Sequence, residues 1–142
     1  MNHQIDNDVI YVSLLPDESV MDSLIAISKK LNLKSGWISG IGAIEGALIG
    51  MYDIRKKKYD KKQFTEEYEL ISFNGNITIK NDEPFVHAHI VFSDSEYKAF
   101  GGHLFETKIS VAGEFIIHKS NKIIKRRMYQ PVGLPLWCLS DE

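Results

Sequence analysis

The 142-residue sequence contains a single cysteine, Cys138, and only four prolines. One cysteine cannot form a disulfide within the chain, which excludes a disulfide-stapled secreted domain and is consistent with a reducing compartment. The first residues carry neither a basic nor an apolar segment, so we expect no signal peptide and a cytoplasmic protein. Seventeen basic and nineteen acidic side chains give a net charge of −2. Without a bulk positive field, any contact with nucleic acid requires a local basic patch.

No long hydrophobic run in the sequence is typical of a membrane span. The longest nearly uncharged stretch extends from Gly36 to Tyr52 and is interrupted by Glu45. Five of the ten glycines lie in it, and glycines within strands mark bulges or close backbone approaches. This stretch therefore predicts a buried, bent pair of strands in a soluble protein. The chain length favours a single domain over residues 1–142, with a core from about residue 10 to residue 139.

The remaining pattern predicts an α+β fold, a mostly antiparallel β-sheet flanked by one main α-helix. Proline, acidic and capping residues at 16–19 indicate a helix start, and apolar residues then recur at helical spacing to a helix end near Asn32. These apolar residues are Val20, Leu24, Ile27 and Leu31. Strands are expected over residues 10–15, 68–73, 76–80, 86–93, 108–117 and 122–128. Turn chemistry occurs at Asn74-Gly75, Asn81-Asp82 and Ser120-Asn121.

Three histidines form the sharpest local feature of the sequence. His87 and His89 are two residues apart in a predicted strand, so their side chains project from the same face. His103 follows the glycine pair 101–102 and supplies a third imidazole if its strand lies alongside. Three neutral imidazoles are a typical zinc ligand set that leaves a fourth position open. The alternative is a polar strand face that binds no metal.

Glu114 is the one candidate for a catalytic acid or base. If its strand adjoins the three histidines, its carboxylate could orient an imidazole or act as a general base on metal-bound water. An ordinary ion pair with Arg126 or Arg127 is the favoured alternative.

Basic residues cluster in two places. One cluster is interleaved with Tyr52 and Tyr59, which could suit nucleic acid, although a solvated, charged hairpin tip is the favoured interpretation. Its members are Arg55, Lys56, Lys57, Lys58, Lys61 and Lys62. The other cluster is residues 125–127.

Several separate motifs, in the same order, resemble the PPC domain, which is conserved in plants and prokaryotes. The resemblance extends from about residue 10 to residue 139. The motifs are Ser39–Ala43, Leu70–Ile77, Pro84–His89, Gly101–Leu104, the Glu114 strand and Gly133–Leu136.

This resemblance implies a PPC-like α+β fold, a homotrimer, and a metal site, with zinc the expected ion, at His87, His89 and His103. Plant members carry an Arg-Gly-Arg AT-hook, which this chain lacks. The family's DNA-binding label therefore predicts at most weak, non-specific contact with DNA here, or a protein partner instead. Two hypotheses stay open: a homotrimeric metal-binding and partner-binding module, and a small zinc-dependent enzyme with Glu114 as general base.

Overall fold

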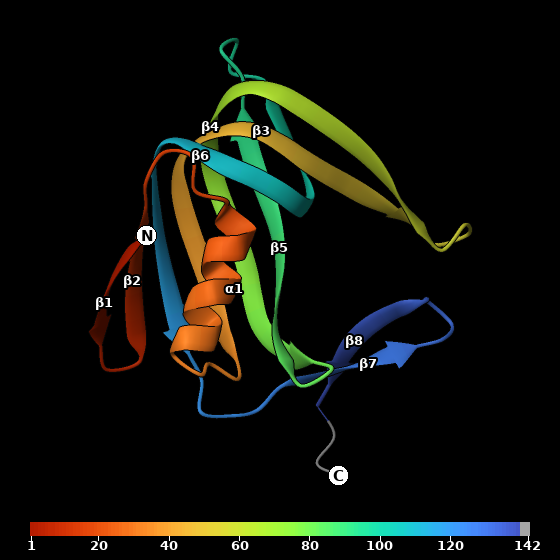
Figure 1. Ribbon diagram of the computed structural model, residues 1–142. Helices are drawn as coiled ribbons and strands as arrows, with labels where there is room; N and C mark the ends of the chain where they lie inside the picture. Colours follow the sequence, from red (N-terminus) through yellow and green to blue (C-terminus); the bar gives the residue numbers. More distant parts are fainter. Residues whose placement is uncertain (140–142) are drawn as a thin grey trace.

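The computed structural model describes residues 1–139, which form one helix and eight strands (Figure 1). The helix, α1, spans Val20–Lys30. The strands are β1 (Asn2–Asp6), β2 (Val9–Leu14), β3 (Gly36–Asp53), β4 (Lys58–Lys80), β5 (Glu83–Ser93), β6 (Ala99–Lys119), β7 (Lys125–Tyr129) and β8 (Leu134–Cys138). All pairings are antiparallel except one parallel bridge between β4 and β7. The expected mostly antiparallel sheet with one helix is confirmed.

Strand β6 closes part of the sheet into a ring. Its residues 99–103 pair with β5, while most of the strand pairs with β3. Since β3 also pairs with β4 and β4 pairs with β5, four strands enclose a common interior. The rings of Phe64, Phe92 and Phe100 meet inside it, with centroids 5.0–5.8 Å apart. This ring of strands fixes where the two ends of β6 lie relative to β5.

Helix α1 packs its apolar stripe on the sheet, against β5 and β6. The side chain of Ser19 caps the helix by accepting a hydrogen bond from a first-turn backbone N–H at 3.3 Å. Asn32, just beyond the helix, takes a positive φ of 52°, which stops the helical path. The predicted helix is confirmed, and its fully buried apolar residues are Val20, Leu24 and Ile27. Within residues 1–139, no helix is long and apolar enough to cross a membrane.

The stretch from Gly36 to Tyr52 is one strand, so the predicted pair of strands is wrong. Strand β3 runs through it and bends at two register shifts against β4, near residues 40–42 and 45–47. Gly46 lies at the second shift with a φ of +64°, a conformation that glycine adopts without strain. The glycines therefore mark bulges within one strand and not a turn between two.

The predicted turn at Asn74-Gly75 is also wrong, because β4 continues through it. A Cβ on Gly75 would lie 2.9 Å from the carbonyl oxygen of His87 on β5. Glycine is required here for close approach of two paired strands. The turn at Asn81-Asp82 is confirmed, with φ values of 51° and 63°.

The pattern misses strands β1 and β8 and the first part of β6. Strand β6 begins at Ala99 and not at Lys108. Gly101 and Gly102 lie within the part of β6 that pairs with β5. A Cβ on Gly101 would lie 2.8 Å from the carbonyl oxygen of Ile90, so glycine permits this close approach. Strand β1 has one β-branched residue and β8 has none, and adjacent glycines interrupt β6, so these segments give too little propensity to be recognised in sequence.

Candidate metal centre

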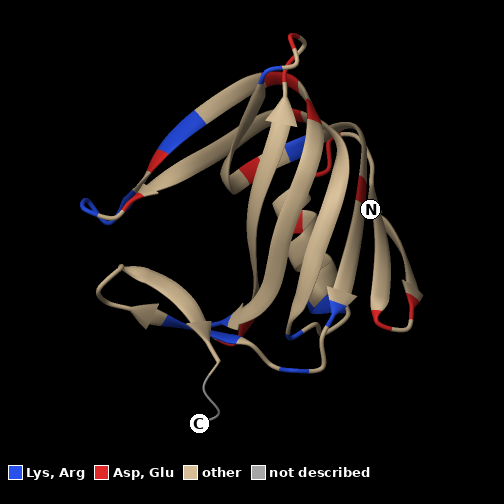
Figure 2. Ribbon diagram, turned by 180° about the vertical axis from the view of Figure 1, so that it is seen from behind, with Lys and Arg blue, Asp and Glu red and all other residues tan. Residues whose placement is uncertain are grey.

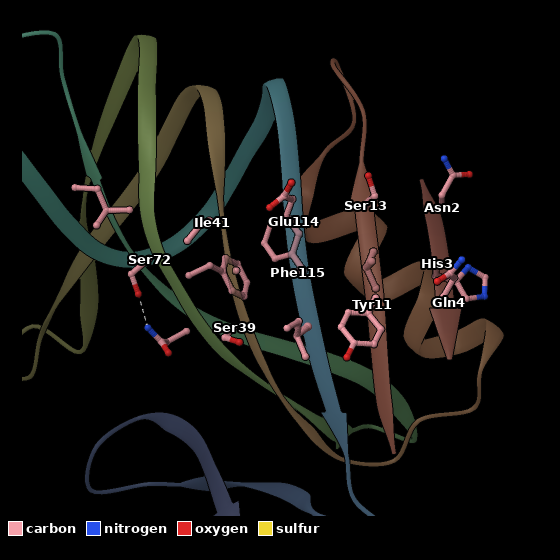
Figure 3. Close-up of a pocket in the computed structure, with 16 residues that line it drawn as sticks. Asn2, His3, Gln4, Tyr11, Ser13, Ser39, Ile41, Ser72, Glu114 and Phe115 are labelled. Atoms are coloured by element: carbon pink, nitrogen blue, oxygen red, sulfur yellow. Dashed lines mark hydrogen bonds between the residues drawn. The ribbon is translucent and has the colours of Figure 1, made fainter. Parts of the chain in front are cut away.

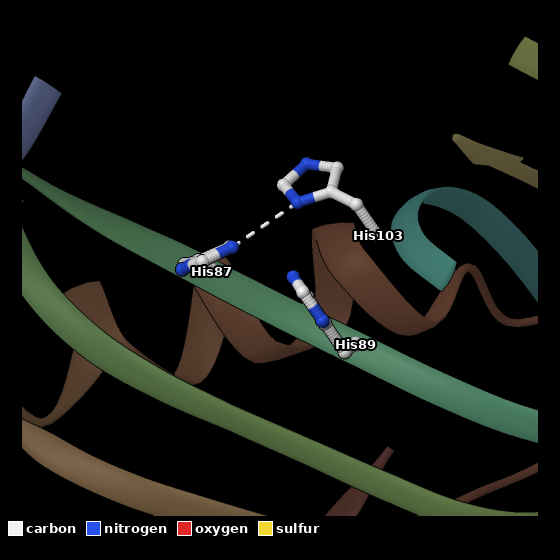
Figure 4. Close-up of side chains that lie close together, drawn as sticks. All are labelled: His87, His89 and His103. Carbon is white, nitrogen blue, oxygen red and sulfur yellow. Dashed lines mark hydrogen bonds between the residues drawn. The ribbon is translucent and has the colours of Figure 1, made fainter. Parts of the chain in front are cut away.

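The structure brings the three predicted histidines together on adjacent strands (Figure 4). His89 of β5 is the register partner of His103 of β6, and His87 lies two residues earlier on the same face of β5. Val86 and Ala88 alternate with them and are buried in the core. The alternation that buries the apolar side chains therefore directs the imidazoles to the opposite face.

The donor atoms of these residues fit a single metal ion. One nitrogen from each ring lies within 4.8 Å of the others, and His87 Nε2 is 3.1 Å from His103 Nδ1 (Figure 4). Two nitrogens on one tetrahedral zinc, each about 2.0–2.1 Å from it, lie roughly 3.4 Å apart. His87, His89 and His103 would hold the ion, which supplies Lewis acidity at its open position.

The environment keeps two of these rings neutral, the form that binds metal. Burial lowers the pKa of His87 to about 4, and the charges of Arg126 and His89 add to the effect. Burial likewise lowers the pKa of His103 to about 4, helped by the charges of His87, His89, Arg126 and Lys61. At neutral pH both rings therefore have an unprotonated nitrogen available without losing a proton to solvent.

Arg126 of β7 lies beside His87. It donates hydrogen bonds to Thr78 Oγ1 (2.8 Å), Asn76 Oδ1 (2.8 Å) and the carbonyl oxygen of Pro135 (3.0 Å). Its Nη2 also lies 3.4 Å from His87 Nδ1. Burial lowers the pKa of Arg126 itself.

Aromatic side chains flank the histidines on the other side. The Tyr59 hydroxyl lies 3.4 Å from His103 Nδ1, and the two ring centroids are 4.6 Å apart. Burial raises the pKa of Tyr59. Phe105 packs on His103 with centroids 4.8 Å apart, and Lys61 Nζ lies 3.9 Å from the Phe105 centroid. These contacts restrict how the His103 ring can turn.

Two hairpins frame the centre. Tyr59 and Lys61 belong to the β3–β4 hairpin, and Arg126 belongs to the β7–β8 hairpin. The tips of the hairpins touch, because the Tyr52 hydroxyl donates to the carbonyl oxygen of Val132 (2.7 Å) and Lys57 Nζ donates to that of Gln130 (2.9 Å). Contacts distant in sequence thus enclose the site.

A cavity of about 470 Å³ opens beside the histidines. Its polar walls come from His89, His103, Tyr59, Asp60, Lys61 and Lys62. Ile49, Met51 and Tyr52 give it an apolar side. Its volume is within the range of small-molecule sites.

Glu114 does not join this centre. It lies in the same strand as His103, but an extended strand rises about 3.3 Å per residue, which separates the two by on the order of 35 Å along β6. Its register partners are Ser13 and Ile41, and it lines a separate cavity on the sheet. The favoured ion pair with Arg126 is wrong as well, because that guanidinium binds Thr78, Asn76 and Pro135.

The first basic cluster forms a hairpin tip, as favoured from the sequence (Figure 2). The Asp53 carboxylate accepts from the backbone N–H groups of Arg55 and Lys56 and pairs with Lys56 Nζ at 3.4 Å. Lys57 reaches across to Gln130. Lys62 Nζ lies over the ring of Phe64, 4.8 Å from its centroid. Several of these cations therefore make contacts within the molecule.

Comparison with known proteins agrees with this architecture. The family model of the Plants and Prokaryotes Conserved (PCC) domain matches residues 2–121. The chain belongs to this family. The resemblance to the PPC domain, as the same family is also abbreviated, is confirmed. A search of curated proteins finds no match for this PCC-domain chain.

Solved structures resemble the PCC domain over nearly their whole lengths. A putative DNA-binding protein of Bacteroides thetaiotaomicron is 30% identical, with a TM-score of 0.94 and 96% of each chain covered. A PPC protein of Pyrococcus horikoshii is 30% identical, with a TM-score of 0.87 and coverage of 99% of this chain and 97% of that one. A metal-containing protein of Archaeoglobus fulgidus is 28% identical, with a TM-score of 0.85 and 96% of each chain covered.

Reasoning from the PCC-domain sequence misses two residues of the centre, Arg126 and Tyr59. Both appear in sequence only as members or neighbours of basic clusters, a pattern that is typical of solvated surface. Nothing in their local spacing indicates that two hairpins fold toward β5. A partly buried arginine between β-strands becomes evident only when its acceptors, Thr78 and Asn76, are placed beside it.

We expect the chelator-treated protein to lose stability as the pH falls from about 6.5 to about 4. The unfolded chain binds protons at histidine near pH 6.5, while folded His87 and His103 resist protonation until about pH 4. The unfolded state therefore holds more protons throughout this window, and acid favours it. Urea-unfolding midpoints at several pH values measure the slope.

The double variant His87→Gln, His103→Gln should have a shallower slope in this window than the parent protein. His118→Gln removes an exposed histidine of β6 outside the group and serves as the control. Equal slopes for the parent and the double variant would contradict the expectation.

Proposed function

We propose that this PCC-domain protein is a homotrimeric metal-binding and partner-binding module that holds one zinc ion per subunit. The observation that carries the proposal is the convergence of one nitrogen each from His87, His89 and His103 within 4.8 Å. Three nitrogens from imidazoles favour zinc over the hard cations magnesium and calcium, which prefer oxygen ligands. The similar Archaeoglobus fulgidus protein, described as metal-containing, supports a metal at this fold.

An exposed apolar surface supports the trimer. Along β2, buried Val12 alternates with Tyr11, which is 48% exposed on the sheet face that α1 leaves uncovered. Ile41 of β3 and Ile71 of β4 are 54% and 51% exposed. A cavity of about 750 Å³ on this face is bordered by all four of these residues, Tyr11, Val12, Ile41 and Ile71 (Figure 3). Large apolar patches of this kind usually mark an interface, and we assign this one to further copies of the chain.

A role for DNA is supported only by the hairpin tip and by the similar Bacteroides thetaiotaomicron protein, which is described as a putative DNA-binding protein. The tip presents Arg55 and Lys58, which have solvent-exposed side chains (Figure 2). Acidic residues are interspersed with the basic ones, and the chain has a net charge of −2. Such a surface contacts phosphates without reading base edges, so we propose weak, non-specific association.

The zinc-enzyme alternative loses its predicted general base, because Glu114 does not lie beside the histidines. Among residues 1–139, the group of potential metal ligands around His103 contains histidines and no carboxylate. Glu114 lines the cavity on the sheet face, together with Tyr11 and Ile41. The module is therefore the function that the geometry supports best.

We expect one zinc ion per chain in tag-free protein after zinc exposure and removal of excess metal. The double variant His87→Ala, His89→Ala removes two of three nitrogen ligands and should weaken zinc binding by at least about 100-fold. Elemental analysis gives the stoichiometry, and a competition titration with a chromogenic chelator gives the affinity. His118→Ala is the matched control. Zinc content near zero in the parent protein, or unchanged in the double variant, would contradict the metal site.

Light scattering should give a mass about three times that of the chain at micromolar concentration. The double variant Ile41→Glu, Ile71→Glu puts charges into the apolar patch and should yield monomers, because charges are costly to bury in an interface. Ile54→Glu, at an exposed position in the β3–β4 turn, is the control and should remain trimeric. A monomeric parent protein would refute the trimer.

Duplex DNA should bind with a dissociation constant of roughly 10⁻⁴ to 10⁻⁶ M at physiological salt, and binding should fade as salt rises. Labelled duplexes of different sequence, titrated at two salt concentrations, measure both properties. The double variant Arg55→Gln, Lys58→Gln should weaken binding, while Lys98→Gln, on the far loop between β5 and β6, should not. Nanomolar, sequence-selective binding at the higher salt would contradict this expectation.

A further inference from the structure

The metal centre is surrounded by positive charge. Arg126 lies within 3.4 Å of His87, and Lys61 lies over Phe105, the ring that packs on His103. A divalent ion on three neutral imidazoles adds two further positive charges to this region.

Nothing in the described chain compensates this charge at close range. Among residues 1–139, no carboxylate lies within 4 Å of Lys61, Lys62 or Arg126, while five other cationic groups do form such pairs. Asp60 is the one acidic residue lining the cavity, and it neighbours two lysines in sequence. The side chains of Lys61 and Lys62 are exposed and line the cavity, so an anion that enters it can reach them without displacing an internal partner.

The adjoining cavity has the composition of an organic-acid site. Its lysines can pair with an anionic group, and the Tyr59 hydroxyl, next to His103, can donate a hydrogen bond. Its apolar side, with Ile49 and Met51, suits a short carbon skeleton better than an inorganic ion. At about 470 Å³, it has room for a small molecule but not for a polymer segment.

We infer that the cavity beside the three histidines binds a small dicarboxylate, with one carboxylate directed to the metal and the other paired with Lys61, which lines the cavity. This inference rests on the proposed zinc site and names the class of ligand that completes it. Lys61 can pair with this carboxylate, because its contact with Phe105 leaves its N–H groups available. Arg126 lies outside the cavity lining, where its guanidinium binds Thr78, Asn76 and Pro135.

Calorimetric titration of the zinc-loaded full chain with malonate tests the inference. Malonate should bind, and malonamide, its neutral analogue of similar shape, should bind at least tenfold more weakly. Lys61→Gln should weaken malonate at least fivefold while leaving zinc content at one per chain. Lys58→Gln makes the same charge change on the same strand, outside the cavity lining, and should leave malonate affinity unchanged.

Circular dichroism checks that Lys61→Gln folds. Malonate that binds the zinc-loaded protein no better than malonamide, or less tightly than inorganic phosphate, overturns the inference. So does an unchanged malonate affinity in Lys61→Gln. A parent protein that takes up no zinc overturns the proposed function first, and its zinc content separates the two cases.

Discussion

The pairing of β6 with β5 is the constraint on which the rest of the site depends. Residues 99–103 leave the long ladder with β3 and join β5, so His103 becomes the register partner of His89. A slip of one residue would turn His103 to the opposite face, because strand side chains alternate. The glycines at 101 and 102 permit this pairing, since a Cβ on Gly101 would meet the carbonyl oxygen of Ile90 at 2.8 Å.

Electrostatics then sets the chemical character of the centre. Partial burial keeps His87 and His103 neutral, the form that coordinates a metal ion. Local cations would repel a metal ion, and in the proposed site an anion shared with the metal would offset that repulsion. Positive charges that disfavour a metal ion bound alone would favour a metal ion bound together with an anion. This links the proposed module to a specific class of ligand.

Several features of the fold could be predicted because they depend on local physics. The helix follows from a capping residue and a stripe at Val20, Leu24 and Ile27, and the turn at Asn81-Asp82 follows from residues that tolerate positive φ. The sequence pattern gave a wrong prediction where a glycine permits close strand contact instead of forming a turn. At Gly75 it permits close strand contact, whereas the sequence pattern of asparagine followed by glycine is typical of a turn.

By itself, the sequence determined the fold class, the family and the three histidines, because alternation and ordered motifs are properties of the chain alone. It could not show that Tyr59 and Arg126 flank these histidines or that Glu114 lies elsewhere on β6. Tyr59 and Arg126 reach the site on separate hairpins whose tips meet at Tyr52 and Val132. Such contacts join residues far apart in the chain, and only the closed ring of strands decides which of them lie together.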